Sequence, residues 1–263
     1  MYDTFSEEYD HFVNWPGRLA YEMPFLLDQI NSVVDRPVGT TRILDTATST
    51  GMHAIALAQK GFVVTGTDIS EGMINIAKKN AAAAGVDVFF TRAAFGEITH
   101  RVKLVPTGRG LPFDVVLCLG NSLPHVEGKA ELEDALNDFY ACLHPGGLLI
   151  LQNRNFDRVL AEKERWMEPQ SYSDAHGEKI YLRFYDFLMD GHIQFNILTL
   201  KRLPEGQWKQ SVMETRLFPI THELLIQSLE NTGFCRIQLH GALSDTPFDV
   251  NSSGNLVVTA IRK

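Results

Sequence analysis

The sequence has few cysteines and no long apolar or basic run. Its three cysteines, Cys118, Cys142 and Cys235, lie far apart and form no Cys-x-x-Cys pair. Two of them fall in apolar or helical runs, so we interpret them as buried thiols in a reducing compartment. No apolar segment is long enough to span a membrane, and the acidic, polar N-terminus argues against a secretory signal. With a formal net charge of −8, the chain disfavours nucleic acid as a partner, and we expect a cytoplasmic protein without a membrane partner.

The stretch ending at Asp68 has the order of half of a nucleotide-binding fold. An apolar strand reaching Leu44 is followed by a tight turn of small residues over 46–51, and helical spacing continues over 52–60. A second strand, 62–68, ends on Asp68, 17 residues after the glycine that closes the turn. In such units the turn and the helix N-terminus face an anionic group, and the acid takes the ribose hydroxyls. The sequence therefore predicts a nucleotide-binding crevice here.

The rest of the chain alternates between strands and helices and then changes its pattern. Three further strands with intervening helices predict parallel pairing, whereas long strands of alternating polarity after residue 156 predict an antiparallel meander. The C-terminal hairpin suggests that one edge strand runs antiparallel. The predicted fold class is α/β: a doubly wound, mostly parallel seven-stranded sheet with an inserted antiparallel β-meander. The expected units are an N-terminal helical lid (1–40), a cofactor-binding α/β domain (41–155 and 220–263) and the β insertion (156–219).

The N-terminal segment has apolar residues at helical spacing over 1–35. Because it precedes the first strand, it could cover the crevice as a lid or pack as an ordinary helix. Pro24 would start a new helix or kink this one. The residues that favour the lid interpretation are Tyr2, Tyr9, Tyr21 and Arg18.

The glycine pattern of the turn narrows the choice of cofactor. A nicotinamide-binding turn would contain G-x-G-x-x-G, but only Gly51 is present. The run from Asp45 to Gly51 resembles the first motif of class I S-adenosylmethionine-dependent methyltransferases, with Ser49 in place of the middle glycine. Phe113-Asp114 and His144-Pro-Gly-Gly147 match later landmarks of that family.

Two further stretches are similar to the glycine and sarcosine N-methyltransferase group within this family. They are Leu119-Gly-Asn-Ser-Leu-Pro-His125 and Asn153-Arg-Asn-Phe-Asp157, and the likeness covers almost the whole chain. The resemblance implies that Arg154 holds a substrate carboxylate, Asn121 contacts the substrate amine, and Arg18 binds the methionine carboxylate of the cofactor.

The candidate residues follow from the motif, the strand ends and this resemblance. The candidates for contact with the acceptor are Asn121, Arg154 and His125, and no metal ligand is predicted. The candidates for cofactor binding are Arg18, Asp45, Thr46, Ala47, Ser49, Gly51, Asp68, Ile69, Met73, Ala94, Phe95, Leu119 and Gly120. Methyl transfer from a sulfonium needs mainly alignment of the nucleophile and exclusion of water, which accounts for the lack of a metal cluster or a Ser–His dyad.

Several of these candidates could have a purely structural role instead. Asp45 could hold turn amides, Asn121 could cap its turn, and His125 could be an ordinary loop histidine. Arg154 could pair with Asp157 or with a carboxylate of the lid.

Ser49 and Ala94 bear on the strength of cofactor binding. Ser49 would be strained if its position requires a positive φ, and Ala94 replaces a polar residue that often receives the adenine amine. The hydroxyls of Thr48 and Ser49 could instead bind the methionine tail, and Phe95 could pack on the adenine ring.

The sequence thus predicts a small-molecule N-methyltransferase that uses S-adenosylmethionine and acts on an amine bearing a carboxylate. The rivals are O-methylation of a small metabolite and a non-catalytic nucleoside-binding module; a nicotinamide dehydrogenase is disfavoured by the missing glycines. The meander could form the roof of a pocket or the interface of a homo-oligomer.

Overall fold

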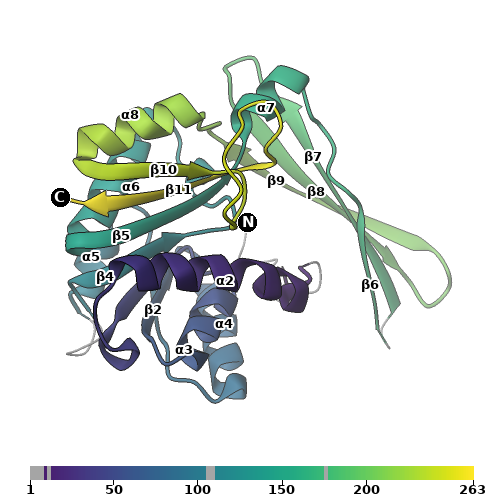
Figure 1. Ribbon diagram of the computed structural model, residues 1–263. Coiled ribbons are helices and arrows are strands. Elements are labelled where there is room, and N and C mark those ends of the chain that lie inside the picture. The colour runs from purple at the N-terminus through teal and green to yellow at the C-terminus, as the bar shows by residue number, and fades with distance from the viewer. Residues whose placement is uncertain (1–8, 11–12, 105–109, 175–176) are drawn as a thin grey trace.

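The computed structural model describes residues 9–10, 13–104, 110–174 and 177–263, whose backbone forms two separate β-sheets (Figure 1). The larger sheet has seven strands in the order β10-β11-β5-β4-β1-β2-β3. They are β1 (Arg42–Thr46), β2 (Val63–Asp68), β3 (Phe89–Arg92), β4 (Phe113–Cys118), β5 (Leu143–Arg154), β10 (Phe234–His240) and β11 (Asn255–Arg262). The strand order reverses between β1 and β4, so the carboxyl ends of these strands mark the point where such sheets bind ligands.

The expected mostly parallel sheet is confirmed, with one difference in its strand directions. β1, β2, β3, β4 and β5 pair in parallel, whereas β11 is antiparallel to both β5 and β10. The antiparallel strand is therefore one position in from the edge, and the prediction of an antiparallel edge strand is wrong. The chain first runs out to the edge as β10 and then returns as β11 to pair with β5.

Two layers of helices bury the faces of this sheet. One layer consists of α2 (Trp15–Val33), α3 (Met52–Gln59) and α4 (Glu71–Ala84), and the other of α5 (Ile98–Val102), α6 (Lys129–Cys142) and α8 (His222–Thr232). Figure 1 shows α2 lying across the sheet, with α3 and α4 farther along the same side. Cys118 and Cys142 are buried in the core, as expected. Each layer buries the apolar stripe of its helices, the main stabilising contribution to the fold.

The predicted helix caps hold the helices on which the site depends. Ser70 accepts a hydrogen bond from the Met73 N–H at 3.1 Å at the start of α4, which ends at Gly85 in the left-handed conformation. Helix α5 was not predicted, because it has only five residues. Its first N–H groups are held by Asp138 of α6, a tertiary contact that local sequence cannot reveal.

The N-terminal helix α2 starts at Trp15, where Asn14 accepts a hydrogen bond from the Gly17 N–H at 3.2 Å. Pro24 lies inside this helix and does not start a new one. Residues 1–8 and 11–12, which include Tyr2 and much of the predicted N-terminal helical segment, lie outside the described residues. A short 3-10 helix, η1 (Val38–Thr40), connects α2 to β1.

The second sheet is the inserted meander, and it projects away from the α/β body (Figure 1). Its strands, all antiparallel, are β6 (Gln170–Asp174), β7 (Gly177–Phe187), β8 (Ile193–Arg202) and β9 (Trp208–Leu217). The last three were predicted, whereas β6 and the preceding α7 (Phe156–Glu162) were not. β6 has no apolar alternation and is defined only by its pairing with β7.

β5 is a long strand of 12 residues. It starts at Leu143, directly after α6, and includes the His144–Gly147 stretch. At its other end it reaches Arg154, which pairs with Asn255 of β11. This extension fixes the backbone of Arg154 within a sheet instead of a loop.

Candidate active site

The turn after β1 places three residues in left-handed backbone conformations. Ala47, Ser49 and Gly51 have φ angles of 50°, 53° and 81°. A left-handed backbone conformation costs a residue with a Cβ on the order of 1–2 kcal/mol, so Ser49 is strained, as expected. The turn is tied to β2 by the Thr48 N–H, which donates to the Thr67 carbonyl at 2.8 Å.

The hydroxyls of this turn bind protein groups. The Thr48 hydroxyl donates to the buried Asp45 carboxylate at 2.5 Å, so it does not face the cofactor cavity. Burial raises the pKa of Asp45, whose described contacts are those of a structural acid beneath the turn. The Ser49 hydroxyl lies 3.6 Å from the Met73 sulfur and hydrogen-bonds Tyr9 in the segment before α2. This bond connects the turn to the lid.

Asp68 ends β2 at the rim of the same turn. Its two carboxylate oxygens accept hydrogen bonds from the backbone N–H of Ser49 at 2.8 Å and of Ser70 at 2.9 Å. The side chain still lines a cavity and is 8% exposed. Each carboxylate oxygen has more than one lone pair, so acceptor capacity remains for ligand hydroxyls.

A cavity of about 500 Å³ opens above this turn and the end of β2. Its described lining joins the turn, the residues after β3 and the loop after β4: Tyr9, Ala47, Ser49, Asp68, Ile69, Met73, Ala93, Ala94, Phe95, Gly96, Glu97, Ile98, Gly120, Ser122, His125, Val126, Glu131 and Asp134. Phe95 rests edge-on against Phe139 and presents an apolar surface to the cavity. The lining combines the Asp68 carboxylate, which suits a ribose, with apolar side chains such as Phe95, which suit an adenine ring.

Four predicted cofactor residues lie outside the described lining of the cavities. They are Asp45, Thr46, Gly51 and Leu119. Thr46 donates its hydroxyl to the Leu117 carbonyl at 2.7 Å, which ties β1 to β4. Asp45 and Thr46 end β1, Gly51 closes the turn at the start of α3, and Leu119 follows β4.

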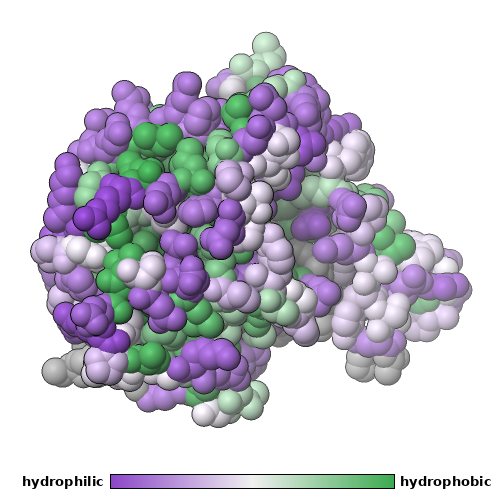
Figure 2. Space-filling model, in the orientation of Figure 1, coloured by the Kyte–Doolittle hydropathy of each residue, from purple (hydrophilic) through white to green (hydrophobic). Residues whose placement is uncertain are grey.

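A second cavity of about 480 Å³ lies between the lid helix, the end of β5 and the inserted sheet. It is lined by Tyr9, Val13, Asn14, Arg18, Gly120, Asn121, His125, Gln152, Asn153, Arg154, Met167, Gln170, Arg183, Tyr185, Phe195, Ile197 and Asn255. Figure 2 shows a recess in the surface between the α/β body and the insertion. Tyr9, Gly120 and His125 line both cavities, which therefore adjoin each other.

Arg18 is positioned by buried charges at the base of the lid. Its Nε lies 3.1 Å from both oxygens of Glu22, and Glu22 in turn contacts His53 Nε2 at 2.6 Å. Burial alone would raise the pKa of Glu22, but the His53 hydrogen bond and the charge of Arg18 hold this pKa below its usual range. Arg18 Nη2 reaches towards Gln152 Oε1 at 3.5 Å, so the guanidinium lies at the second cavity near Gly120.

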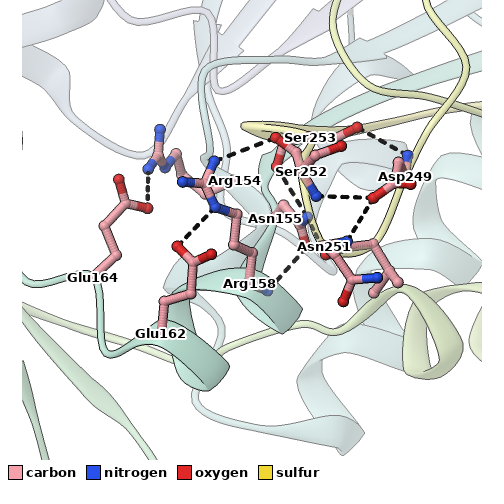
Figure 3. A network of polar contacts seen from close by, with 10 residues as sticks. Arg154, Asn155, Arg158, Glu162, Glu164, Asp249, Asn251, Ser252 and Ser253 are labelled. Carbon is pink, nitrogen blue, oxygen red and sulfur yellow. Dashed lines mark hydrogen bonds and ion pairs between the residues drawn. The ribbon is translucent and has the colours of Figure 1, made fainter.

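Asn121 and Arg154 are joined where β4 and β5 end. Asn121 has φ 65°, and its Oδ1 accepts a hydrogen bond from the Arg154 backbone N–H at 2.9 Å. The Arg154 Nη2 donates to Glu164 at 3.0 Å (Figure 3). The considered pairing of Arg154 with Asp157 is wrong, because Asp157 binds His222 at 2.9 Å. Asn121 thus caps its turn and also lines the second cavity.

His125 lies at the junction of the two cavities, in η2 (Leu123–His125). Burial lowers its pKa to about 4, so the imidazole is neutral at physiological pH. Its Nδ1 is 3.4 Å from the Thr215 hydroxyl of β9. A neutral imidazole can accept a hydrogen bond, but a pKa of about 4 makes His125 a weak base at neutral pH, which disfavours the proton-acceptor role considered for it.

The lowered pKa of His125 predicts a pH-dependent stability. The unfolded chain binds a proton near pH 6.5 and the folded chain only near pH 4. The stability contributed by the neutral, buried ring is therefore present above about pH 6.5 and is lost as the pH falls towards 4, by up to about 3 kcal/mol. Urea unfolding across this range should show a steeper loss for the wild type than for His125→Gln. Parallel curves would contradict the assignment.

Several cavity residues were missed by the sequence analysis. Gln152 and Asn153 directly precede Arg154 and line the same cavity. Because Arg154 was expected at a strand end, its position could have indicated that these two neighbours also reach the cavity. Gln170 and Arg183 come from the insertion. Their approach to the crevice depends on how the two sheets pack, which no local pattern encodes.

Membrane-spanning helices and metal sites are both absent from the described part of the chain. Among these residues, no helix is long and apolar enough to cross a membrane. No group of three or more His, Cys, Asp or Glu side chains in the same ranges is arranged to hold a metal ion.

Comparisons with known proteins bear directly on this geometry. Residues 43–147 match a family model described as a methyltransferase domain. The chain is 28% identical over 244 residues to a glycine/sarcosine N-methyltransferase of Aphanothece halophytica, covering 93% of this chain and 83% of that protein. It is 36% identical over 132 residues to the glycine N-methyltransferase of Rattus norvegicus, covering 48% and 44% of the two chains. An S-adenosylmethionine-dependent methyltransferase from Clostridium acetobutylicum shares the fold with a TM-score of 0.75 and 16% identity, over 99% of this chain and 98% of that chain.

The fold, the two adjoining cavities and these matches define an S-adenosylmethionine-dependent methyltransferase of class I. The protein is an enzyme of this class, and S-adenosylmethionine is its cofactor. Within the class, the chain is similar to glycine/sarcosine N-methyltransferases over most of its length, which confirms the resemblance found in its motifs.

Proposed function

We propose that this enzyme transfers the methyl group of S-adenosylmethionine to the nitrogen of a small amine that also carries a carboxylate. The observation that carries the proposal is the charge of the second cavity. Its described lining contains Arg18, Arg154 and Arg183 and no carboxylate. Such a lining favours an anionic or zwitterionic acceptor over a cationic one.

The residues divide into a cofactor side and an acceptor side. When bound, S-adenosylmethionine supplies a methyl group activated by the sulfonium. Asp68 would hold the ribose and Arg18 the methionine carboxylate, while Ala47 and Ser49 shape the turn beside them. Ile69, Met73, Ala94 and Phe95 would enclose the adenosine.

On the acceptor side, Arg154 would hold the carboxylate, and Asn121 and His125 would face the amine. Asn121 Oδ1 already accepts the Arg154 N–H, so a second lone pair on that oxygen would receive an amine hydrogen. His125 is neutral and would accept a hydrogen bond from the amine. Tyr9 spans both cavities and would help to exclude water.

The names of the relatives support this choice. Glycine/sarcosine N-methyltransferases of Aphanothece halophytica and Halorhodospira halochloris are 28% and 27% identical to the chain. Glycine and sarcosine both combine an amine with a carboxylate, the chemistry that Arg154 and Asn121 would recognise.

Replacing Arg154 with glutamine tests the carboxylate clamp. We expect kcat/KM for glycine to fall by roughly 100-fold, because a guanidinium–carboxylate pair in a desolvated site is lost. Turnover of glycinamide, which lacks the carboxylate, should change much less. The measurement is S-adenosylhomocysteine formation with both acceptors.

Arg158→Gln is the matched control for that experiment. Arg158 pairs with Glu162 at 2.9 Å as Arg154 pairs with Glu164, but it lies outside the described lining of both cavities (Figure 3). Its substitution should leave both acceptors unaffected. An equal loss for glycine and glycinamide in Arg154→Gln would contradict the clamp.

O-methylation is the second candidate, and His125 is the observation that favours it. His125 is neutral and lies at the junction of the two cavities, where a ring nitrogen can accept a hydrogen bond from the hydroxyl group of an acceptor. Mass spectrometry of the product distinguishes the two reactions, since fragmentation assigns the added methyl to nitrogen or oxygen.

A further inference from the structure

Buried polar atoms without a protein partner converge on the acceptor cavity. In the described part of the chain they include Nδ2 and Oδ1 of Asn153, Nε of Arg154 and Oε1 of Gln170. Buried polar groups in native proteins are almost always hydrogen-bonded, because an unpaired one pays its full cost of desolvation. A group of such atoms around one cavity indicates that their partner is a ligand.

Asn153 differs from its neighbour Asn155 in this respect alone. Both residues are 1% exposed. The Asn155 amide donates to the carbonyls of Val250 and Ser253 at 2.9 and 3.0 Å, and its Oδ1 accepts the Arg158 N–H at 3.3 Å (Figure 3). Asn155, the N-cap of α7, thus joins this helix to the loop before β11. Asn153 lies within β5, and neither polar atom of its side chain has a partner within the protein.

The size of the cavity adds a second constraint. Its volume is about 480 Å³, and the methionine end of the cofactor, which Arg18 would hold, takes part of this space. Glycine is small enough to leave part of the remaining space unfilled. Beyond the amine and the carboxylate there is room for a side chain, in a space that Asn153 and Gln170 share with Met167, Phe195 and Ile197.

We propose that Asn153 determines acceptor specificity, and that the acceptor is an amino acid larger than glycine whose side chain both donates and accepts hydrogen bonds, as a carboxamide does. The Asn153 amide offers one donor group and one acceptor, which match a carboxamide in a paired arrangement. Gln170 Oε1, on β6, would accept a further N–H of the same group. This inference rests on the proposed function and names its substrate class.

The stability of Asn153→Leu provides the first test, because it separates a ligand-binding role from a structural one. Leucine has nearly the shape of asparagine and removes two unpaired buried polar atoms. The melting temperature of the ligand-free protein should therefore be equal to or higher than that of the wild type. Asn155→Leu is the matched control. It should lower the melting temperature by about 5 °C or more, because the backbone groups that Asn155 binds would lose their hydrogen-bond partner. A comparable loss in Asn153→Leu would overturn the proposal.

Acceptor selectivity provides the second test. The kcat/KM of the wild type should be at least about 30-fold higher for L-asparagine than for L-leucine, because leucine would leave Asn153 unpaired. In Asn153→Leu this ratio should fall to about 3 or below. A wild type that turns over glycine but does not prefer asparagine to leucine would overturn the inference and leave the proposed function intact. No turnover with any of the three amino acids, together with turnover of an amine lacking a carboxylate, would overturn both.

Discussion

Replacing Asp68 with alanine should weaken S-adenosylmethionine binding by roughly 100-fold or more. A carboxylate that receives two ribose hydroxyls makes charge-assisted hydrogen bonds, each contributing about 1.5–3 kcal/mol. The same carboxylate also holds the Ser49 and Ser70 amides, so its loss releases the turn that shapes the cavity. Both effects act in the same direction. Calorimetric titration with S-adenosylmethionine and S-adenosylhomocysteine measures the change.

The two effects can be separated with a ligand variant and a control protein. If Asp68 binds the ribose, the wild type should discriminate against S-adenosylhomocysteine that lacks the 2′-hydroxyl, and Asp68→Ala should not. Asp28→Ala, on the exposed side of α2, removes one negative charge away from the cavity and should leave affinity unchanged. Unaltered affinity in Asp68→Ala would show that the ribose lies elsewhere.

The nucleotide-binding half of the fold could be predicted because its signals are local. The apolar strand, the turn of small residues, the helix capped by Ser70 and the acid at the end of β2 each occupy a few consecutive residues. The order of these elements along the chain was enough to predict a parallel sheet. The turn residue Ser49 and the acid Asp68, both predicted to bind the cofactor, line the same cavity in the structure.

The acceptor half could not be predicted to the same extent, because it depends on packing between distant segments. Arg154 follows Asn153 in sequence, but its ion pair with Glu164 depends on how the chain turns back after α7. Gln170 reaches the cavity only because β6 pairs with β7. Nor does sequence distinguish Asn153 from Asn155, since the difference lies in which of them finds protein partners.

The two cavities differ in the parts of the chain that form them. The proposed donor cavity is built mainly from the turns and strand ends of the α/β sheet, whereas α2 and the insertion contribute to the proposed acceptor cavity. Tyr9, Gly120 and His125 stand where the two meet. A change of acceptor can therefore arise in the insertion without disturbing the cofactor side, which is consistent with one fold serving several substrates.

Gly51→Ala should be among the most destabilising single substitutions of this turn. Gly51 has φ +81°, and an added Cβ would lie 2.8 Å from Cζ of the buried Phe90 and 2.9 Å from Cβ of Ala77. The left-handed backbone costs an alanine about 1–2 kcal/mol, and overpacking adds about 1–3 kcal/mol. We therefore expect the free energy of unfolding to fall by roughly 3–4 kcal/mol, which lowers the melting temperature by about 10 °C.

Gly85→Ala separates the two contributions to that loss. Gly85 has φ +66° at the end of α4, but nothing lies within 4 Å of its added Cβ. It should pay only the backbone cost of about 1–2 kcal/mol and keep its affinity for S-adenosylmethionine. Gly51→Ala should also bind the cofactor more weakly, because relief of the clash with Phe90 must move the turn that carries Ser49. Equal losses of stability in the two variants would show that backbone strain, and not the close packing of the turn on Phe90, requires glycine at position 51.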